Sequence, residues 1–351
     1  MKTQRYRIFD QEFELRSDHA DTLAIMDVMF RRFAVADNDG DALRYDVLTK
    51  LGGAAGIHTK DFTYIVEQPS LLPSQAHGII LRHTLRQIRT HLLFHAATLS
   101  RRGKGIILAA DSGCGKTTLT LALVRQGFKM LSDETAALSL SNGELAPYPR
   151  CLWVRAGTHR IFQQFGWDLP SHQIALKKSD RTAIHLSAAL MGNNCQPRYL
   201  IITQRPDEGD ERMCDITLDT LPDKLWADLQ ASGIEPVRLQ SFPVFKAKEK
   251  HINKIYDACE QHNVLVLDVE ETAVAPSYYE NTPQLQEISK LTAAISLLRY
   301  FLGSYRSVIV HDQGSAAGLI PPLVKILAPV KCYRATPGKL DQTVEIINDL
   351  C

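Results

Sequence analysis

The chain has 351 residues, 45% hydrophobic and 23% charged, which suffices for the core of one large domain or two to three ordinary ones and excludes a disordered tail protein. Forty lysines and arginines against 39 acidic residues leave a net charge of +1, so no global field favours nucleic acid or an anionic membrane as partner. No apolar run reaches the roughly 18 residues of a membrane span. Residues 1–14 contain charged side chains of both signs and do not have the basic and then apolar pattern of a secretion signal, so we expect a cytoplasmic protein without a membrane partner.

Residues 1–94 are predicted to form an N-terminal α+β region. Alternating apolar and polar residues at 6–15 predict short strands, and a helical pattern follows at 22–33. Apolar residues spaced by three and four positions over 78–93 predict a further amphipathic helix.

From residue 95 to 250 the pattern changes to strands alternating with helices, which predicts an α/β core. Short apolar runs at 105–110 and 199–203 predict buried strands, and 117–126 predicts a helix. Residues 129–131 lead as a strand into an acidic pair. The step Asn142-Gly143 between two apolar runs is a hairpin signal.

The third region, residues 251–351, is predicted as an α/β extension, with 250–325 as a candidate insertion. Apolar runs at 264–269 and 308–310 predict strands, and 285–302 predicts one long helix. Residues 331–350 predict a closing strand, a Pro-Gly turn and a helix. The basic stretch 246–254 lacks interleaved aromatic residues and is interpreted as a solvated helix face.

The segment 110–117, with the sequence ADSGCGKT, matches the relaxed P-loop pattern, with alanine where glycine is usual. It follows an apolar strand and enters a helix, the geometry in which backbone N–H groups converge on phosphate oxygens. Gly113 and Gly115 permit positive φ angles and a close approach of the backbone. The predicted nucleotide-binding residues are Asp111, Ser112, Gly113, Cys114, Gly115, Lys116, Thr117 and Thr118.

A P-loop of this kind implies ATP and Mg²⁺ as cofactors. Lys116 is expected to neutralise the β and γ phosphates, and the hydroxyl of Thr117 to ligate Mg²⁺. Such sites also use a carboxylate at the end of another strand, and the adjacent acids Asp133 and Glu134 follow the P-loop helix closely. A solvated turn is the alternative interpretation of this pair.

Three further side chains are candidates for the site. His95 lies among apolar residues at the start of a predicted strand, where a catalytic histidine and a satisfied core histidine are equally open interpretations. Arg150 and Arg155 flank a predicted strand after the acidic pair. Either arginine could contact phosphate or substrate, and the alternative is an ordinary surface position.

Several of these segments together resemble the HPr kinase/phosphorylase superfamily, and most closely its divergent HPr kinase-related branch. His95 precedes Lys116 by 21 positions and Asp133 follows it by 17, intervals that match the family. The resemblance is specific over residues 93–155 and returns at 331–350, whereas 250–325 has no counterpart in it. The segments of this chain that carry the resemblance are residues 93–97, 106–118, 121–123, 127, 131–134 and 147–150.

This resemblance implies a P-loop kinase core similar to that of phosphoenolpyruvate carboxykinase, and ATP-dependent phosphorylation of a serine hydroxyl on a protein or peptide. By position, Asp133 resembles the residue that accepts the serine proton, Glu134 a magnesium-site acid, and His95 a residue near the transferred phosphate. A small-molecule or sugar kinase and an ATP-binding regulatory module with little turnover are the alternatives. A homo-oligomer is compatible with the sequence.

Overall fold

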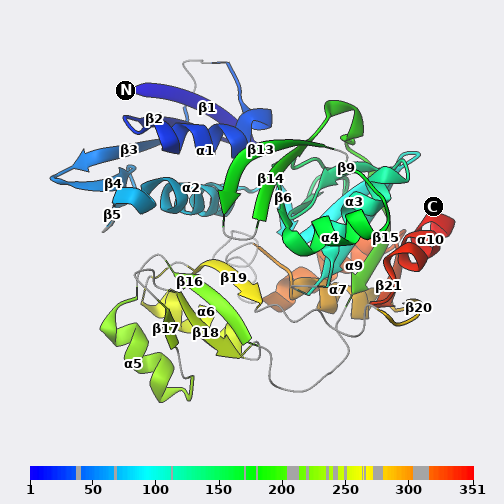
Figure 1. Ribbon diagram of the computed structural model, residues 1–351. Helices are drawn as coiled ribbons and strands as arrows, with labels where there is room; N and C mark the ends of the chain where they lie inside the picture. Colours follow the sequence, from blue (N-terminus) through cyan, green and yellow to red (C-terminus); the bar gives the residue numbers. More distant parts are fainter. Residues whose placement is uncertain are drawn as a thin grey trace.

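The protein has an α/β fold built from several sheets and the helices that pack on them (Figure 1). The computed structural model describes residues 1–36, 41–66, 69–111, 114–169, 171–178, 181–203, 213–218, 221–234, 237–239, 244–248, 251–262, 264, 266–271, 280–302 and 316–351. Within these residues, every helix is too short or too polar to cross a membrane.

The N-terminal region is a five-stranded sheet in the order β1-β2-β3-β4-β5, with helices α1 and α2 packed on it. Alternation places Tyr6, Phe13 and Tyr45 on one face of the sheet, where they are buried against these helices. Strands β2 and β3 are parallel and are joined through α1, as a βαβ unit requires. The elements are β1 (Lys2–Ile8), β2 (Gln11–Ser17), α1 (Ala20–Phe30), a 3-10 helix (Arg31–Phe33), β3 (Leu43–Leu51), β4 (Ala54–His58), β5 (Thr63–Val66), a 3-10 helix (Pro69–Leu71) and α2 (Leu72–Gln87).

The prediction of a helix over 78–93 is wrong for the C-terminal part of that range. Helix α2 ends at Gln87, and Leu92 and Leu93 belong to strand β6 (His91–Phe94). This strand pairs antiparallel with β10 (Ala136–Ser139), which buries both leucines. A short apolar run suits a buried strand as well as a helix, and here the long-range pairing decides between them.

A six-stranded sheet in the order β20-β21-β15-β8-β7-β9 has helices on both faces, and its strands β15, β21 and β20 lie at the right of the view in Figure 1. Along β8, Ile106 and Leu108 pack towards α3 and α10, while Ile107 and Ala109 pack towards α7 and α9. Both faces are buried, which explains the continuous apolar run. The elements are β7 (Ala96–Arg101), β8 (Lys104–Ala110), α3 (Lys116–Arg125), β9 (Lys129–Ser132), β15 (Gln196–Thr203), β20 (Gln284–Glu287), α7 (Lys290–Leu298), α9 (Ile320–Leu327), β21 (Lys331–Thr336) and α10 (Leu340–Leu350).

Three smaller sheets complete the fold. The hairpin predicted at Asn142-Gly143 is confirmed, because β10 pairs antiparallel with β11 (Leu145–Ala146) and Gly143 has a φ of +70°. A second sheet has the order β12-β14-β13, and the third, β17-β18-β16-β19, draws strands from both sides of residue 250. The remaining elements are β12 (Leu152–Arg155), α4 (Ala156–Gln164), β13 (Ser171–Lys178), β14 (Arg181–Leu186), a 3-10 helix (Ala188–Leu190), β16 (Met213–Leu218), α5 (Asp223–Ala231), β17 (Val237–Leu239), β18 (Val244–Lys248), α6 (Ile252–Gln261), β19 (Val266–Glu271) and a 3-10 helix (Ala316–Leu319).

Two predictions for the C-terminal part are wrong. The helix expected over 285–302 is divided into β20 and α7, because the side chain of Ser289 accepts a hydrogen bond from the backbone N–H of Thr292 and so caps a helix that begins at Lys290. The basic stretch 246–254 contains the end of β18 and the start of α6 instead of one helix face. The strand expected at 308–310 lies outside the described residues.

Candidate active site

The P-loop segment turns from β8 into α3 as the sequence predicts. The backbone N–H of Asp111 donates to the carbonyl of Thr203 at 3.3 Å, and that of the buried Cys114 donates to the carbonyl of Asp111 at 3.1 Å. Gly115 is the N-cap of α3 with a φ of 73°, a conformation that glycine adopts without strain. The first N–H groups of α3 therefore face the loop, where they can bind phosphate. Ser112 and Gly113 lie outside the described residues.

Sheet topology brings the other site residues to the same edge. Strand β7 is antiparallel to both β8 and β9, so these two strands run in the same direction. Their carboxyl ends, which lead to the P-loop and to Asp133, lie at one edge of the sheet, and His95 immediately precedes β7 at that edge. The intervals between His95, Lys116 and Asp133 thus correspond to the neighbouring ends of β7, β8 and β9.

His95 contacts the P-loop lysine. Nζ of Lys116 and Nε2 of His95 are 2.9 Å apart, and because an ammonium group has only donors, the histidine nitrogen is the acceptor in this contact. Burial lowers the pKa of Lys116, and the negative charges of Asp133 and Glu134 oppose that effect. The charge of Lys116 therefore interacts with both acids that follow β9.

Asp133 contacts the P-loop threonine. The hydroxyl of Thr117 donates to Oδ2 of Asp133 at 2.9 Å. Burial raises the pKa of Asp133 to about 6; Lys116 acts in the opposite direction, and Glu134 adds to the increase. Oδ1 of Asp133 is buried without a hydrogen bond of normal geometry within the described structure. One carboxylate oxygen is therefore held by Thr117, while Thr120 of α3 lies close enough to the carboxyl to lower its pKa without making a hydrogen bond of normal geometry.

Glu134 is paired with Arg150. Nη1 of Arg150 lies 3.1 Å from Oε2 of Glu134, with the arginine side chain 10% exposed and the glutamate 34%. Burial disfavours the charged arginine and is the largest single effect, but Glu134, Tyr148 and Cys151 together outweigh it, so the pKa of Arg150 is raised. Nη2 of Arg150 also lies 3.5 Å from Nε2 of His77 on α2, so the N-terminal region reaches the acidic pair. Arg150 thus belongs to this site, where it binds a protein carboxylate.

Arg155 and Thr118 lie on the α4 side of the P-loop helix. The hydroxyls of Thr118 and Thr158 are 2.8 Å apart and join the first turn of α3 to that of α4. Arg155 ends β12 and is the N-cap residue of α4. It therefore lies about one helical turn before Thr158.

Two residues of the site, Arg299 and Tyr300, were not predicted from the sequence. The hydroxyl of Tyr300 donates to Oδ1 of Asp111 at 2.8 Å, and Nη2 of Arg299 lies 4.0 Å from the same oxygen. They follow α7 in a region without a recognisable motif. No local signal in the sequence indicates this contact, because 189 positions separate Tyr300 from Asp111.

The residues at this edge fit a magnesium ion. In the described part of the chain, no group of three or more His, Cys, Asp and Glu side chains could by itself hold a metal ion. Mg²⁺ bound with a nucleotide needs fewer protein ligands, because phosphates and waters supply the others. The hydroxyl of Thr117 and the carboxylate of Glu134, the residue after Asp133, are oxygen donors of the required type.

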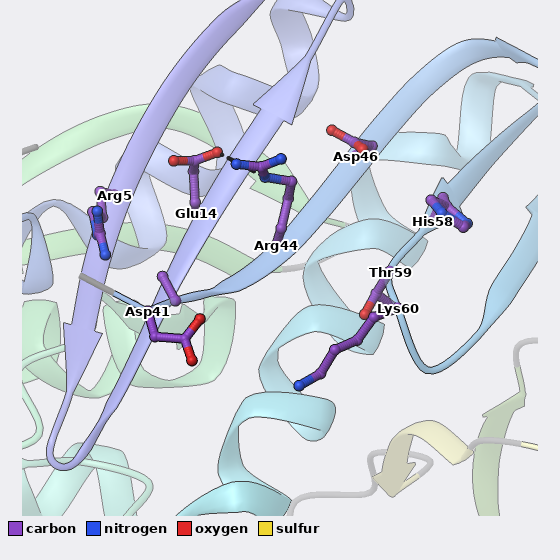
Figure 2. Close-up of a pocket in the computed structure, with 9 residues that line it drawn as sticks. Arg5, Glu14, Asp41, Arg44, Asp46, His58, Thr59 and Lys60 are labelled. Atoms are coloured by element: carbon purple, nitrogen blue, oxygen red, sulfur yellow. Dashed lines mark hydrogen bonds and ion pairs between the residues drawn. The ribbon is translucent and has the colours of Figure 1, made fainter. Parts of the chain in front are cut away.

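The N-terminal sheet carries a separate polar hollow of about 480 Å³ (Figure 2). Arg44 and Glu14, which are register partners on β3 and β2, pair at 3.2 Å in its lining. The lining holds both cationic and anionic side chains, so positive charge is not concentrated there for phosphate, and none of the predicted site residues lines it. It is lined by Arg5, Glu14, Asp41, Ala42, Arg44, Asp46, His58, Thr59 and Lys60.

Comparison with known proteins gives slight structural likeness and no match in sequence. No family model matches the chain, and no curated protein matches it. Among solved structures, the Hpr(Ser) kinase/phosphatase from Coxiella burnetii aligns with a TM-score of 0.21 and 16% sequence identity, over 33% of this chain and 62% of that one. The aligned part thus falls short of two thirds of that kinase, and a likeness of this size carries no argument about function.

Proposed function

We propose that the protein is a P-loop kinase that transfers the γ-phosphoryl group of ATP to a serine hydroxyl of a protein or peptide, with Mg²⁺ as cofactor. The observation that carries the proposal is the contact of Thr117 with Asp133, next to the contact of Lys116 with His95. A phosphate-binding loop, its cation and a carboxylate with a free oxygen meet at one sheet edge. Phosphoryl transfer needs little more from a protein than this positioning and charge.

The proposed step uses these groups in named roles. The acceptor oxygen forms a bond to the γ-phosphorus while the bond from that phosphorus to the β,γ-bridging oxygen breaks, and the bonding electrons leave with ADP. The proton of the acceptor hydroxyl passes to Asp133. Lys116 and the N-terminus of α3 bind the phosphate oxygens on which negative charge is spread. Mg²⁺ held by Thr117 and Glu134 would neutralise part of that charge.

The environment of Asp133 suits a general base. A base works best when its pKa lies near the working pH, and burial brings the pKa of Asp133 to about 6. Oδ2 is occupied by Thr117, so Oδ1 is the oxygen that would receive the proton. Arg150 holds Glu134 in place, which keeps the second carboxylate beside the first.

The choice of a polypeptide serine as acceptor follows the resemblance over residues 93–155. The same groups would serve a sugar hydroxyl, because the acceptor takes part only through its oxygen and its proton. The experiment is to incubate the protein and a Lys116→Ala variant with labelled ATP and a lysate of the host, and to identify phosphorylated products by mass spectrometry. A phosphoserine product that requires Lys116 supports the proposal, whereas Lys116-dependent phosphate found only on a metabolite replaces it with a small-molecule kinase.

A further inference from the structure

The segment after α7 is tied to the P-loop edge at three points. The hydroxyl of Tyr300 donates to Asp111, and the carbonyl of Tyr300 accepts from the backbone N–H of His95 at 2.6 Å. The backbone N–H of Leu302 donates to the carbonyl of Leu93 at 2.8 Å. Tyr300 is 8% exposed. The backbone of residues 299–302 is therefore fixed beside the phosphate-binding loop.

Arg299 differs from its fixed neighbour. Its side chain is 60% exposed, and its Nη2 lies 4.0 Å from Oδ1 of Asp111, beyond hydrogen-bond distance. An exposed ion pair of this kind contributes little to stability, so little opposes a move to a stronger anion. Because the adjacent Tyr300 is anchored, the guanidinium is kept at the rim of the loop without being locked there.

The other cations described at this site do not provide an exposed guanidinium. Lys116 contacts His95 at 2.9 Å, and Arg150 is largely buried in its ion pair with Glu134. A phosphoryl group in transfer spreads negative charge over three oxygens, and a planar guanidinium can donate to two of them at once. Arg299 is placed to supply that donor from within the same chain.

We propose that Arg299 is an arginine finger acting in cis: with a nucleoside triphosphate in the P-loop, its guanidinium leaves Asp111 and donates to oxygens of the transferring phosphoryl group. The inference rests on the proposed kinase function and adds a catalytic residue to it. Arg299 does not exchange a proton during phosphoryl transfer, because a guanidinium stays protonated in proteins. Tyr300 keeps its bond to Asp111, so the loop carboxylate stays in place when the guanidinium leaves it.

The test compares two nucleotide complexes by calorimetry, MgADP alone and MgADP with aluminium fluoride, which mimics the phosphoryl group in transfer. Wild type, Arg299→Ala and Arg198→Ala are measured. Arg198 is an exposed arginine near the amino end of β15, away from the loop, and serves as the matched control. Arg299→Ala should bind MgADP as wild type does but bind the aluminium fluoride complex at least about tenfold more weakly, since such arginines act on the transition state.

Each outcome decides the inference. Arg198→Ala should match wild type in both complexes, and Arg299→Lys should recover only part of the loss, because an ammonium is not a bidentate donor. An equal loss for both complexes in Arg299→Ala would mean that the residue only supports the loop structure, and no loss for either would remove it from the site. If wild type itself does not bind MgADP, the proposed kinase function fails instead.

Discussion

The side chains of Thr117 and Asp133 meet at 2.9 Å, although one begins helix α3 and the other follows strand β9. Two strands that run in the same direction on either side of β7 bring them together. The contact joins the P-loop segment to a buried carboxylate, and the chemistry proposed for the protein depends on it.

Gly115 offers a test of the loop backbone. Gly115→Ala places a side chain at a φ of 73° and should cost about 1 to 2 kcal/mol of stability. Gly127→Ala is the matched control: Gly127 has a φ of +89° and no other group lies within 4 Å of the position that a methyl group would take, so it meets the same strain far from the loop. Both variants should unfold earlier in urea, but only Gly115→Ala should also weaken MgATP binding in calorimetry. Equal nucleotide affinity in the two variants would separate Gly115 from the phosphate site.

The two acids should differ in function. Asp133→Asn keeps the shape of the side chain but removes the base, so transfer from labelled ATP to the acceptor should fall by about 10² to 10⁴-fold while MgATP binding persists. Glu134→Gln should instead weaken the dependence of binding on Mg²⁺. Titrating Mg²⁺ at fixed ATP for both variants separates these roles. If both lose nucleotide binding equally, the division of labour is wrong.

Asp133 should also make stability depend on pH in the protein without nucleotide. Its pKa is raised from 3.8 to about 6, so the folded state binds this proton more tightly than the unfolded state. The contribution of Asp133 is therefore most favourable below about pH 4 and is lost as pH rises through about 6. Asp133→Asn should raise the free energy of unfolding more at pH 8 than at pH 5, as urea titrations would show. A gain that does not change with pH would contradict the burial argument.

Arg150 is expected to stabilise the fold through Glu134. Arg150→Met removes the cation that pairs with Glu134, next in sequence to the carboxylate of Asp133. The change should lower the free energy of unfolding by about 2 kcal/mol. This is less than the full value for a buried ion pair, because Glu134 is partly exposed. The exposed pair of Arg31 with Asp27 is the control, and Arg31→Met should cost no more than about 0.5 kcal/mol. Urea unfolding measures both. A loss at Arg150 as small as that at Arg31 would show that the pair contributes little.

Local patterns predicted much of the central region. The P-loop, the strand before it and the helix after it are adjacent in sequence, so the apolar run, Gly115 and the helical spacing are sufficient to identify them. The hairpin at Asn142-Gly143 is equally local. These elements need no information from distant residues.

Long-range contacts account for what could not be predicted. Leu92 and Leu93 have helical spacing but pair with β10, and the apparent long helix at 285–302 is divided because β20 pairs with β21. The pairing of Arg150 with Glu134 joins residues that are 16 positions apart and has no local signal. Tyr300 contacts Asp111 from 189 positions away, in a segment whose composition shows nothing unusual. Such contacts depend on tertiary structure that a local pattern does not contain.

The central claim is that residues 110–117 bind the phosphates of ATP, and Lys116 tests it most directly. Calorimetry should compare MgATP binding by wild type, Lys116→Ala and Lys104→Ala, the last an exposed lysine at the start of the same strand. Wild type and Lys104→Ala should bind with equal affinity, and Lys116→Ala should lose most of the binding, since it removes the cation that faces the phosphates. An unchanged affinity for MgATP in a folded Lys116→Ala protein would contradict the account.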